Sequence, residues 1–197
     1  MLSEFRIRIA QTPSKRLPVF SDVRRASVAA ILRGAPSGPE ILLIRRATRK
    51  GDPWSGQMAF PGGRSEPQDD SLVATVCRET REEIGLDLRA TAHLLGALDE
   101  VDATIRGAST GLIVTPFVFE LEQVDPPLMP NDEVADTCWT PIGPLIRGER
   151  SAEYTYVHRG KPIQMPAYAV GDQLVWGLTH RMLCSLFELV QDASDGP

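Results

Sequence analysis

The chain has 197 residues, a length that suits one globular domain with a sizeable core. Hydrophobic residues make up 42% and charged residues 24%, which argues against a disordered or fibrous protein. The net charge of −5 provides no general basic surface, so no nucleic acid is expected as a partner. The longest apolar runs are shorter than the about 18 residues of a membrane-spanning helix, so no membrane partner is expected either.

The first 22 residues are polar and interrupted by charges, and they predict an N-terminal arm or a short helix packed on the body. Cys77, Cys138 and Cys184 are too far apart for a metal or redox motif and are interpreted as reduced core thiols. A cytoplasmic location is therefore expected. Three isolated histidines lack a second ligand at metal-binding spacing and are predicted to be structural: His93, His158 and His180.

Apolar runs and turn residues predict the elements in chain order. Residues 26–32 and 41–44 flank a Gly- and Pro-rich turn and predict a pair of antiparallel strands. Residues 51–63 predict a loop with a brief strand at 57–60. The later segments predict three strands, a hairpin that turns at Arg159-Gly160 and a closing helix: residues 93–98, 112–119, 134–139, 154–170 and 176–190.

A helix is predicted between the loop and these later strands. Asp70 or Ser71 can cap its start, and Gly85 suits the left-handed residue that ends a helix. One apolar stripe recurs at helical spacing: Val73, Val76, Thr80 and Ile84. The whole pattern predicts an α/β or α+β fold with a mixed central β-sheet covered on both faces.

Three glutamates on this helix share one face. Glu79 and Glu83 lie about 40° apart around the axis, and Glu82 lies about 60° to the other side of Glu79. Arg78 can pair with Glu82, but one guanidinium cannot neutralise three carboxylates. A divalent cation can, and oxygen ligands favour Mg²⁺ or Mn²⁺. The alternative is a solvated acidic face paired with Arg78 and Arg81.

The run GGRSEPQDDSLVATVCRETREEIGL, residues 62–86, resembles the signature of the Nudix hydrolases. That signature ends in R-E-U-x-E-E-x-G-U, where U is aliphatic, and six positions match in register: Arg78, Glu79, Glu82, Glu83, Gly85 and Leu86. Thr80 fills an aliphatic position. Asp70 takes the place of the first glutamate with one extra residue after Gly63, and is interpreted as a helix-capping or Arg78-pairing residue.

The resemblance continues outside the signature. Residues 60–63, 133–141 and 176–179 are similar to segments of the family, the last to the closing helix of its coenzyme A diphosphatase branch. Asp52 departs from that branch, which usually has arginine there. The implied fold is the Nudix α/β/α sandwich, over residues 23–192 with a C-terminal tail at 193–197.

The resemblance implies a pyrophosphohydrolase that uses Mg²⁺ or Mn²⁺. Glu79 and Glu83 would be the principal metal ligands, with Glu82 and the Gly63 carbonyl as further contacts. Glu82 is the first choice for the base that activates water, and Glu100 and Glu133 stay open. Arg78 would orient the glutamates. Arg46, Gly62 and Gly63 are the predicted substrate-binding residues.

The expected substrate is a small nucleotide derivative such as coenzyme A or a related ester. ADP-ribose, NADH, dinucleoside polyphosphates and oxidised nucleotides are alternatives, because pocket residues come from scattered loops. A module of another class, which senses a nucleotide without cleaving it, would keep the same fold. A homodimer is left open as the assembly.

Overall fold

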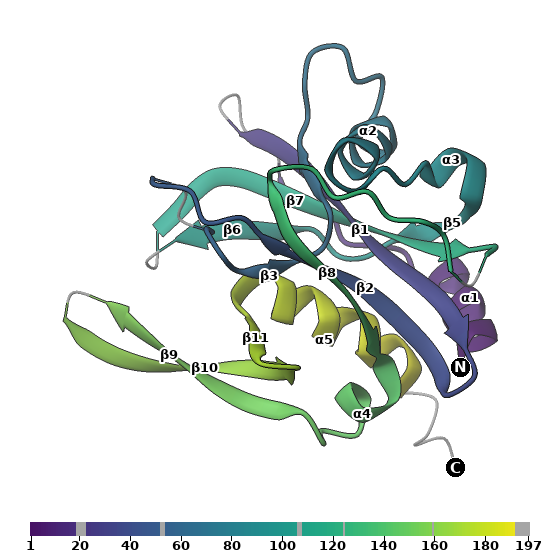
Figure 1. Cartoon of the computed structure of the whole chain (residues 1–197). Helices are drawn as coiled ribbons and strands as arrows, with labels where there is room; N and C mark the ends of the chain where they lie inside the picture. Colours follow the sequence, from purple (N-terminus) through teal and green to yellow (C-terminus); the bar gives the residue numbers. More distant parts are fainter. Residues whose placement is uncertain (19–22, 52–53, 106–107, 124, 159, 192–197) are drawn as a thin grey trace.

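The computed structural model describes residues 1–18, 23–51, 54–105, 108–123, 125–158 and 160–191. Its centre is an eight-stranded mixed sheet (Figure 1). β1 (Arg24–Ala35) runs parallel to β7 (Ala108–Leu121) and antiparallel to β2 (Gly38–Arg46). The hairpin of β1 and β2 closes where Ala35 pairs with Gly38, as the Gly- and Pro-rich turn predicts.

The other strands of this sheet pair with β1, β2 or β7. β3 (Met58–Ala59) and β8 (Val134–Pro141) pair with β2, β4 (Gly62–Arg64) pairs with β1, and β5 (Ala92–Ala97) and β6 (Val101–Ile105) pair with β7. One parallel pair among antiparallel ones makes the sheet mixed. The predicted fold class is confirmed.

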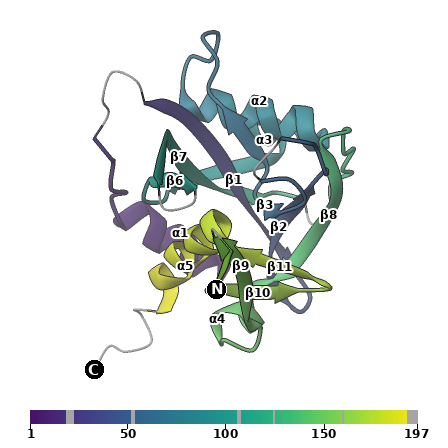
Figure 2. The same ribbon diagram turned by 90° about the vertical axis from the view of Figure 1, so that its left-hand side faces the viewer.

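Helices cover both faces of the sheet. α2 (Leu72–Ile84) and α3 (Leu88–Thr91) lie on one face, and α1 (Leu2–Gln11) and α5 (Gly177–Gln191) on the other (Figures 1 and 2). β1 serves both cores, since Ile31 packs in the core below α2 and Leu32 in the core below α5. This alternation follows from the two-residue period of a strand.

The predicted glutamate helix is α2. The Ser71 hydroxyl accepts a hydrogen bond from the Ala74 amide at 3.1 Å, so Ser71 is the N-cap. Gly85 ends the helix with φ of 72°. Val76, Thr80 and Ile84 of the predicted stripe are buried, which fixes the helix on the sheet.

A second, three-stranded sheet follows β8 and the short helix α4 (Ile142–Ile146). It contains β9 (Ser151–His158), β10 (Lys161–Val170) and β11 (Gln173–Trp176). The predicted hairpin is β9 and β10, although Arg159 of its turn lies outside the described residues. β4, β6, β11, α3 and α4 have no counterpart among the predicted elements, since each is five residues or shorter.

The first 22 residues begin with a helix, one of the two predicted options. Phe5 and Ile9 bury the inner face of α1 against the α5 side of the core. Residues 19–22, Asp52 and the predicted tail at 193–197 lie outside the described residues. Among the helices that the structure describes, each is too short or too polar to cross a membrane.

Candidate active site

β4 lies against β1 closely enough to require glycine. Gly62 has φ of 143°, and a Cβ atom there would lie 2.3 Å from the Ser27 carbonyl oxygen. The Ser27 hydroxyl donates to the Leu72 carbonyl at 2.8 Å, which ties the start of α2 to the same strand. Strand and helix therefore form one support for the carboxylates.

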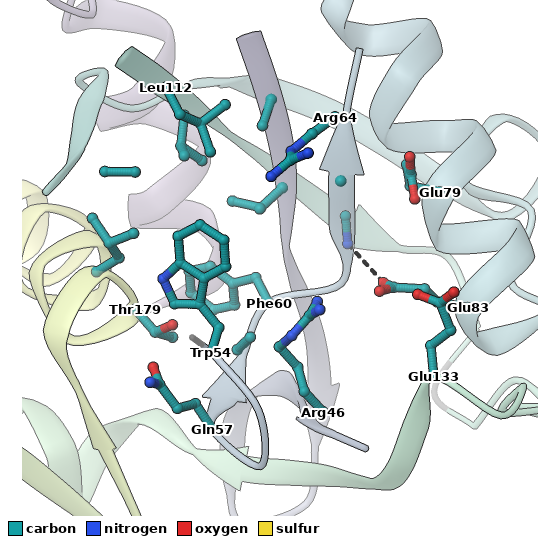
Figure 3. Close-up of a pocket in the computed structure, with 18 of the residues that line it drawn as sticks. Arg46, Trp54, Gln57, Phe60, Arg64, Glu79, Glu83, Leu112, Glu133 and Thr179 are labelled. Carbon is teal, nitrogen blue, oxygen red and sulfur yellow. Dashed lines mark hydrogen bonds between the residues drawn. The ribbon is translucent and has the colours of Figure 1, made fainter. Parts of the chain in front are cut away.

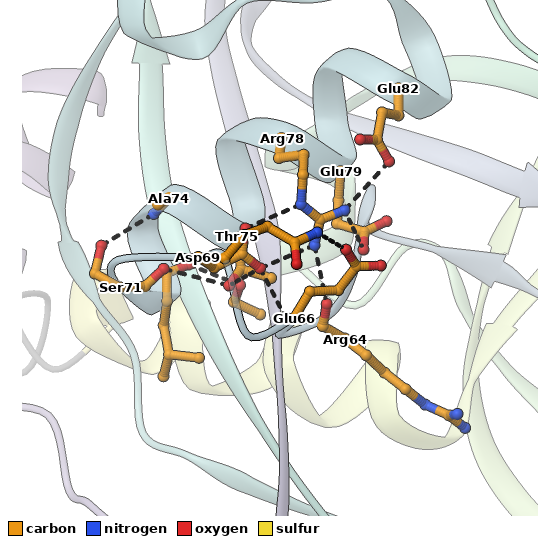
Figure 4. Close-up of polar contacts among 12 residues, drawn as sticks. Arg64, Glu66, Asp69, Ser71, Ala74, Thr75, Arg78, Glu79 and Glu82 are labelled. Atoms are coloured by element: carbon orange, nitrogen blue, oxygen red, sulfur yellow. Dashed lines mark hydrogen bonds and ion pairs between the residues drawn. The ribbon is translucent and has the colours of Figure 1, made fainter.

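Arg78 holds the loop before α2 against the helix (Figure 4). Its Nε and Nη2 atoms donate to the two carboxylate oxygens of Asp69 at 3.0 and 2.9 Å. Nη2 also donates to the Arg64 carbonyl at 3.1 Å. Hydrogen bonding from Arg78 keeps the pKa of Asp69 well below its ordinary value, so the pair stays charged.

The same guanidinium reaches two of the glutamates. Arg78 Nη1 donates to Glu79 at 3.0 Å and to Glu82 at 3.2 Å. The side chain of Glu82 is 57% exposed, whereas that of Glu79 is 19% exposed. Arg78 thus orients both side chains, with Glu79 the more firmly enclosed.

Glu83 is the most buried acid of the helix. It is 4% exposed, and its carboxylate accepts a hydrogen bond from the Gly62 amide at 2.8 Å. Burial raises the pKa of Glu83 to about 7, while the Gly62 amide and the Arg46 charge act in the opposite direction. Burial also raises the pKa of Glu79. The negative charge of two buried carboxylates beside each other is relieved by a proton or by a bound cation.

These side chains line one wall of a pocket of about 490 Å³ (Figure 3). Glu79, Glu83 and Glu133 lie on one side of β4, and Trp54 and Phe60 lie on the other. The apolar wall continues through residues of β1, β3, β7 and α5: Val28, Met58, Leu112, Val114, Leu178 and Met182. The volume is in the range of small-ligand sites.

The NUDIX domain family matches residues 23–159. The chain belongs to the Nudix family. It is 33% identical to an uncharacterised Nudix hydrolase, NudL, of Yersinia pestis over 85% of the chain and 80% of that protein. It is 32% identical to a mitochondrial coenzyme A diphosphatase of Homo sapiens over 79% of the chain, and the match spans 66% of that relative's length.

Another relative and two solved structures are also similar to the chain. An uncharacterised protein of Schizosaccharomyces pombe is 38% identical over 64% of the chain, and the match covers 44% of its length. The fold resembles a MutT/nudix family protein from Enterococcus faecalis, with a TM-score of 0.56 at 18% identity over 97% of this chain and 70% of that one. A Nudix hydrolase from M. smegmatis gives a TM-score of 0.53 at 14% identity, over 89% and 88% of the two chains.

The structure corrects the alignment of the first acid in the Nudix signature. Asp70 is exposed, neither capping α2 nor pairing with Arg78, because Ser71 and Asp69 have these roles. Asp69 keeps the regular spacing from Gly63, so the extra residue lies between Asp69 and Arg78. The regular spacing between Gly63 and Asp69 is the feature of the sequence that could have identified Asp69. The loop accommodates the insertion because the Asp69 carboxylate also accepts from the Thr75 hydroxyl at 2.9 Å.

The predicted substrate-binding residues of the Nudix domain all line the pocket: Arg46, Gly62 and Gly63. Leu178 and Thr179, from the segment similar to the coenzyme A diphosphatase branch, line it too. Trp54 and Arg64 were not predicted, because only the fold brings the loop before β3 and the end of β4 to one cavity.

The two alternative bases lie in different places. Glu133 faces the same pocket beside Glu83, and it pairs with Arg49 at 3.0 Å (Figure 3). Glu100 is not among the pocket-lining residues that the structure describes. Its buried carboxylate accepts from Arg16, from the Leu17 amide at 2.8 Å and from Thr115 at 3.0 Å. Glu100 therefore joins the N-terminal arm to the sheet.

Replacing Glu100 with glutamine should lower the free energy of unfolding by about 1–3 kcal/mol at pH 7, because buried donors lose a charged acceptor. Although burial acts against ionisation, hydrogen bonds from Arg16, Leu17 and Thr115 lower the pKa of Glu100. A carboxylate with a lowered folded-state pKa stabilises above its unfolded value and loses this effect as the pH falls. Urea unfolding should therefore show the difference from wild type shrinking below about pH 4.

Glu149→Gln is the control, since Glu149 forms an exposed pair with Arg147 and should matter little. Folded Glu100→Gln should also keep its turnover. A large loss of turnover in a stable variant would instead assign Glu100 a catalytic role.

The Glu79 carboxyl group lies directly against Gly63. A Cβ atom on Gly63 would lie 2.4 Å from the Glu79 Cδ atom. Gly63→Ala should displace this carboxylate and reduce kcat/KM by about 10- to 100-fold, since small shifts of a catalytic group are costly. Gly34→Ala is the matched control, because its Cβ would meet Leu2 Cδ1 at an ordinary 3.5 Å. Equal turnover of Gly63→Ala and wild type would contradict a role for Glu79 in its present position.

The cysteines and histidines that the structure describes do not line the pocket. The cysteines are free, as predicted. Cys77 is buried in the core below α2, Cys138 is partly buried against the core below α5, and Cys184 is partly buried. Among the described residues, no three His, Cys, Asp or Glu side chains stand close enough to enclose a metal ion. Glu79 accepts a hydrogen bond from Arg78, and Glu83 accepts one from the Gly62 amide.

Proposed function

We propose that the chain is a divalent-cation-dependent hydrolase that cleaves the diphosphate linkage of a nucleoside diphosphate derivative, with coenzyme A or a coenzyme A ester as the first candidate. The observation that carries the proposal is the meeting of Glu79, Glu83 and the Gly62–Gly63 backbone at one wall of a pocket with an apolar opposite wall. Nudix relatives and solved Nudix structures support the reaction class.

The donor set fits Mg²⁺ or Mn²⁺. The carboxylates of Glu79, Glu82 and Glu83 and the Gly63 carbonyl are hard oxygen donors, and no cysteine or histidine lines the described pocket. Burial of Glu79 and Glu83 favours a cation that would offset their charge. When bound, the ion would neutralise diphosphate oxygens and make water more acidic.

The chain's own residues then position the reactants. Water attacks one phosphorus, the bond from that phosphorus to the bridging oxygen breaks, and the oxygen leaves with the second phosphate. The proton from water passes to a carboxylate, for which Glu82 is the first choice and Glu133 the alternative. Arg78 orients Glu79 and Glu82, and Arg46 lies near Glu83, where it would contact the phosphates at the bond to be cleaved.

Coenzyme A is favoured by two observations. The human relative is named a coenzyme A diphosphatase, and Leu178 and Thr179 of the similar segment line the pocket. The apolar wall is also compatible with ADP-ribose, NADH, dinucleoside polyphosphates or oxidised nucleotides. A nucleotide sensor would use the same pocket without turnover, but the signature glutamates favour the enzyme.

The test is a screen of these compounds with Mg²⁺ and with Mn²⁺, in which products are identified by mass spectrometry. The expected result is a nucleotide and a second phosphorylated product, with coenzyme A giving the highest kcat/KM. Because coenzyme A carries a 3′-phosphate, its products should be adenosine 3′,5′-bisphosphate and phosphopantetheine. Ligand-dependent thermal stabilisation without any product would support the sensor. Cleavage of only nucleoside triphosphates would reject coenzyme A.

A further inference from the structure

Arg64 projects into the pocket from the strand that separates its two walls. Opposite residues of an antiparallel pair point to the same face of a sheet. Gly63 is opposite Ser27, whose hydroxyl bonds to α2, and Arg64 is opposite Ala26, which packs in the α5 core and lines the pocket. Arg64 therefore faces the apolar compartment, while Gly63 faces Glu79 (Figure 3).

The backbone and the side chain of Arg64 have different environments. Its carbonyl accepts a hydrogen bond from Arg78 at 3.1 Å, which fixes the backbone at Arg64 to α2. Figure 4 shows the side chain extending away from that network. Within the described ranges, its guanidinium has no hydrogen bond or ion pair.

The other pocket arginines already face acids. Arg78 contacts Asp69, Glu79 and Glu82, and Arg46 faces Glu83. Arg64 lines the same pocket as the aromatic residues Trp54 and Phe60, and lies with them on the side of β4 away from Glu79 (Figure 3). A guanidinium binds phosphate in a forked geometry, and a flat apolar and aromatic wall suits a nucleobase.

We propose that Arg64 is a substrate-binding residue that holds the phosphate of the nucleoside half whose base enters the apolar compartment. This inference rests on the proposed function and adds an orientation to it. The nucleotide half of the substrate lies on the Arg64 side of β4. The bond to be cleaved lies at the edge of β4, beside Glu79 and Glu83. Arg64 would then disfavour substrates without a nucleotide half.

The test compares Arg64→Gln, Arg64→Lys and Arg81→Gln by calorimetry with adenosine monophosphate and with adenosine in Mg²⁺ buffer. Adenosine monophosphate has no anhydride bond and cannot be consumed. Arg64→Gln should weaken its binding by about 10- to 100-fold, since a charge-assisted phosphate contact is lost, and should leave adenosine unaffected. The affinity of Arg64→Lys for adenosine monophosphate should lie between those of wild type and Arg64→Gln. Lysine keeps the positive charge but cannot donate two parallel hydrogen bonds to a phosphate. Arg81→Gln, exposed on α2 and outside this pocket, should match wild type.

Two results would overturn the inference: equal binding of adenosine monophosphate by Arg64→Gln and wild type, or wild-type binding of this nucleotide no tighter than that of adenosine. With a compound that is hydrolysed, Arg64→Gln should raise KM more than it lowers kcat. If no compound is hydrolysed but nucleotide binding still depends on Arg64, the proposed function and the orientation of a cleaved bond fail, and only the role of Arg64 in binding the nucleotide phosphate stands. If hydrolysis is found with unchanged nucleotide binding, the inference alone fails.

Discussion

Glu83→Gln is expected to abolish turnover while the protein remains folded. Glutamine has the same shape and can still accept from the Gly62 amide, so β4 and α2 should stay in place. The loss of the charge should lower kcat/KM by at least about 100-fold. This is more than the effect of removing a residue that only hydrogen-bonds to a metal ligand. Because the Glu83 carboxylate is buried, the neutral amide should match or exceed the wild-type melting temperature.

Activity and thermal unfolding of this variant should be measured together, with Glu188→Gln as an exposed control. A drop in activity that follows a drop in melting temperature would point to misfolding. A stable variant with more than a tenth of wild-type turnover would remove Glu83 from the proposed machinery.

Arg78→Ala should have the largest effect on stability. It leaves Asp69, whose side chain is 4% exposed, without its bidentate partner, and it releases Glu79 and Glu82 to repel each other. Loss of one partner of an enclosed charged pair costs about 3 kcal/mol, reduced here because Arg78 itself is 21% exposed. Chemical unfolding should show this loss, and hydrogen exchange should show weaker protection at residues 64–71.

Arg81→Ala is the matched control, since Arg81 is an exposed arginine on the same helix. Arg78→Lys tests the contribution of the bidentate hydrogen bonding, because lysine keeps the charge but cannot donate to both carboxylate oxygens of Asp69 in this geometry. Equal stabilities of Arg78→Ala and Arg81→Ala would show that the network in Figure 4 contributes nothing to the fold.

The elements with strong local signals could be predicted from the sequence. α2 has a cap, an apolar stripe and a glycine end, and all three are present in the structure. The mixed sheet covered on both faces follows from apolar runs such as residues 41–44, which alternate between the two cores. β4 was not predicted, because its pairing with β1 is a non-local contact of two glycines and an arginine.

The candidate site likewise has a part that the sequence predicts and a part that only the fold brings together. Glu79, Glu82 and Glu83 lie on one helix, so their common face follows from helical geometry alone. Arg64, Trp54 and Thr179 meet only because β4, the loop before β3 and α5 fold together. The choice of Asp70 over Asp69 was wrong because the loop before a helix has no periodicity to fix its register.

The binding of Mn²⁺ by the glutamate helix tests the central claim most directly. Calorimetry of wild type and Glu83→Gln with Mn²⁺, in the presence of adenosine monophosphate, should show uptake by the wild type and weaker uptake by the variant. No uptake by the folded wild type, or equal uptake by both proteins, would contradict the proposal that these carboxylates hold a catalytic cation.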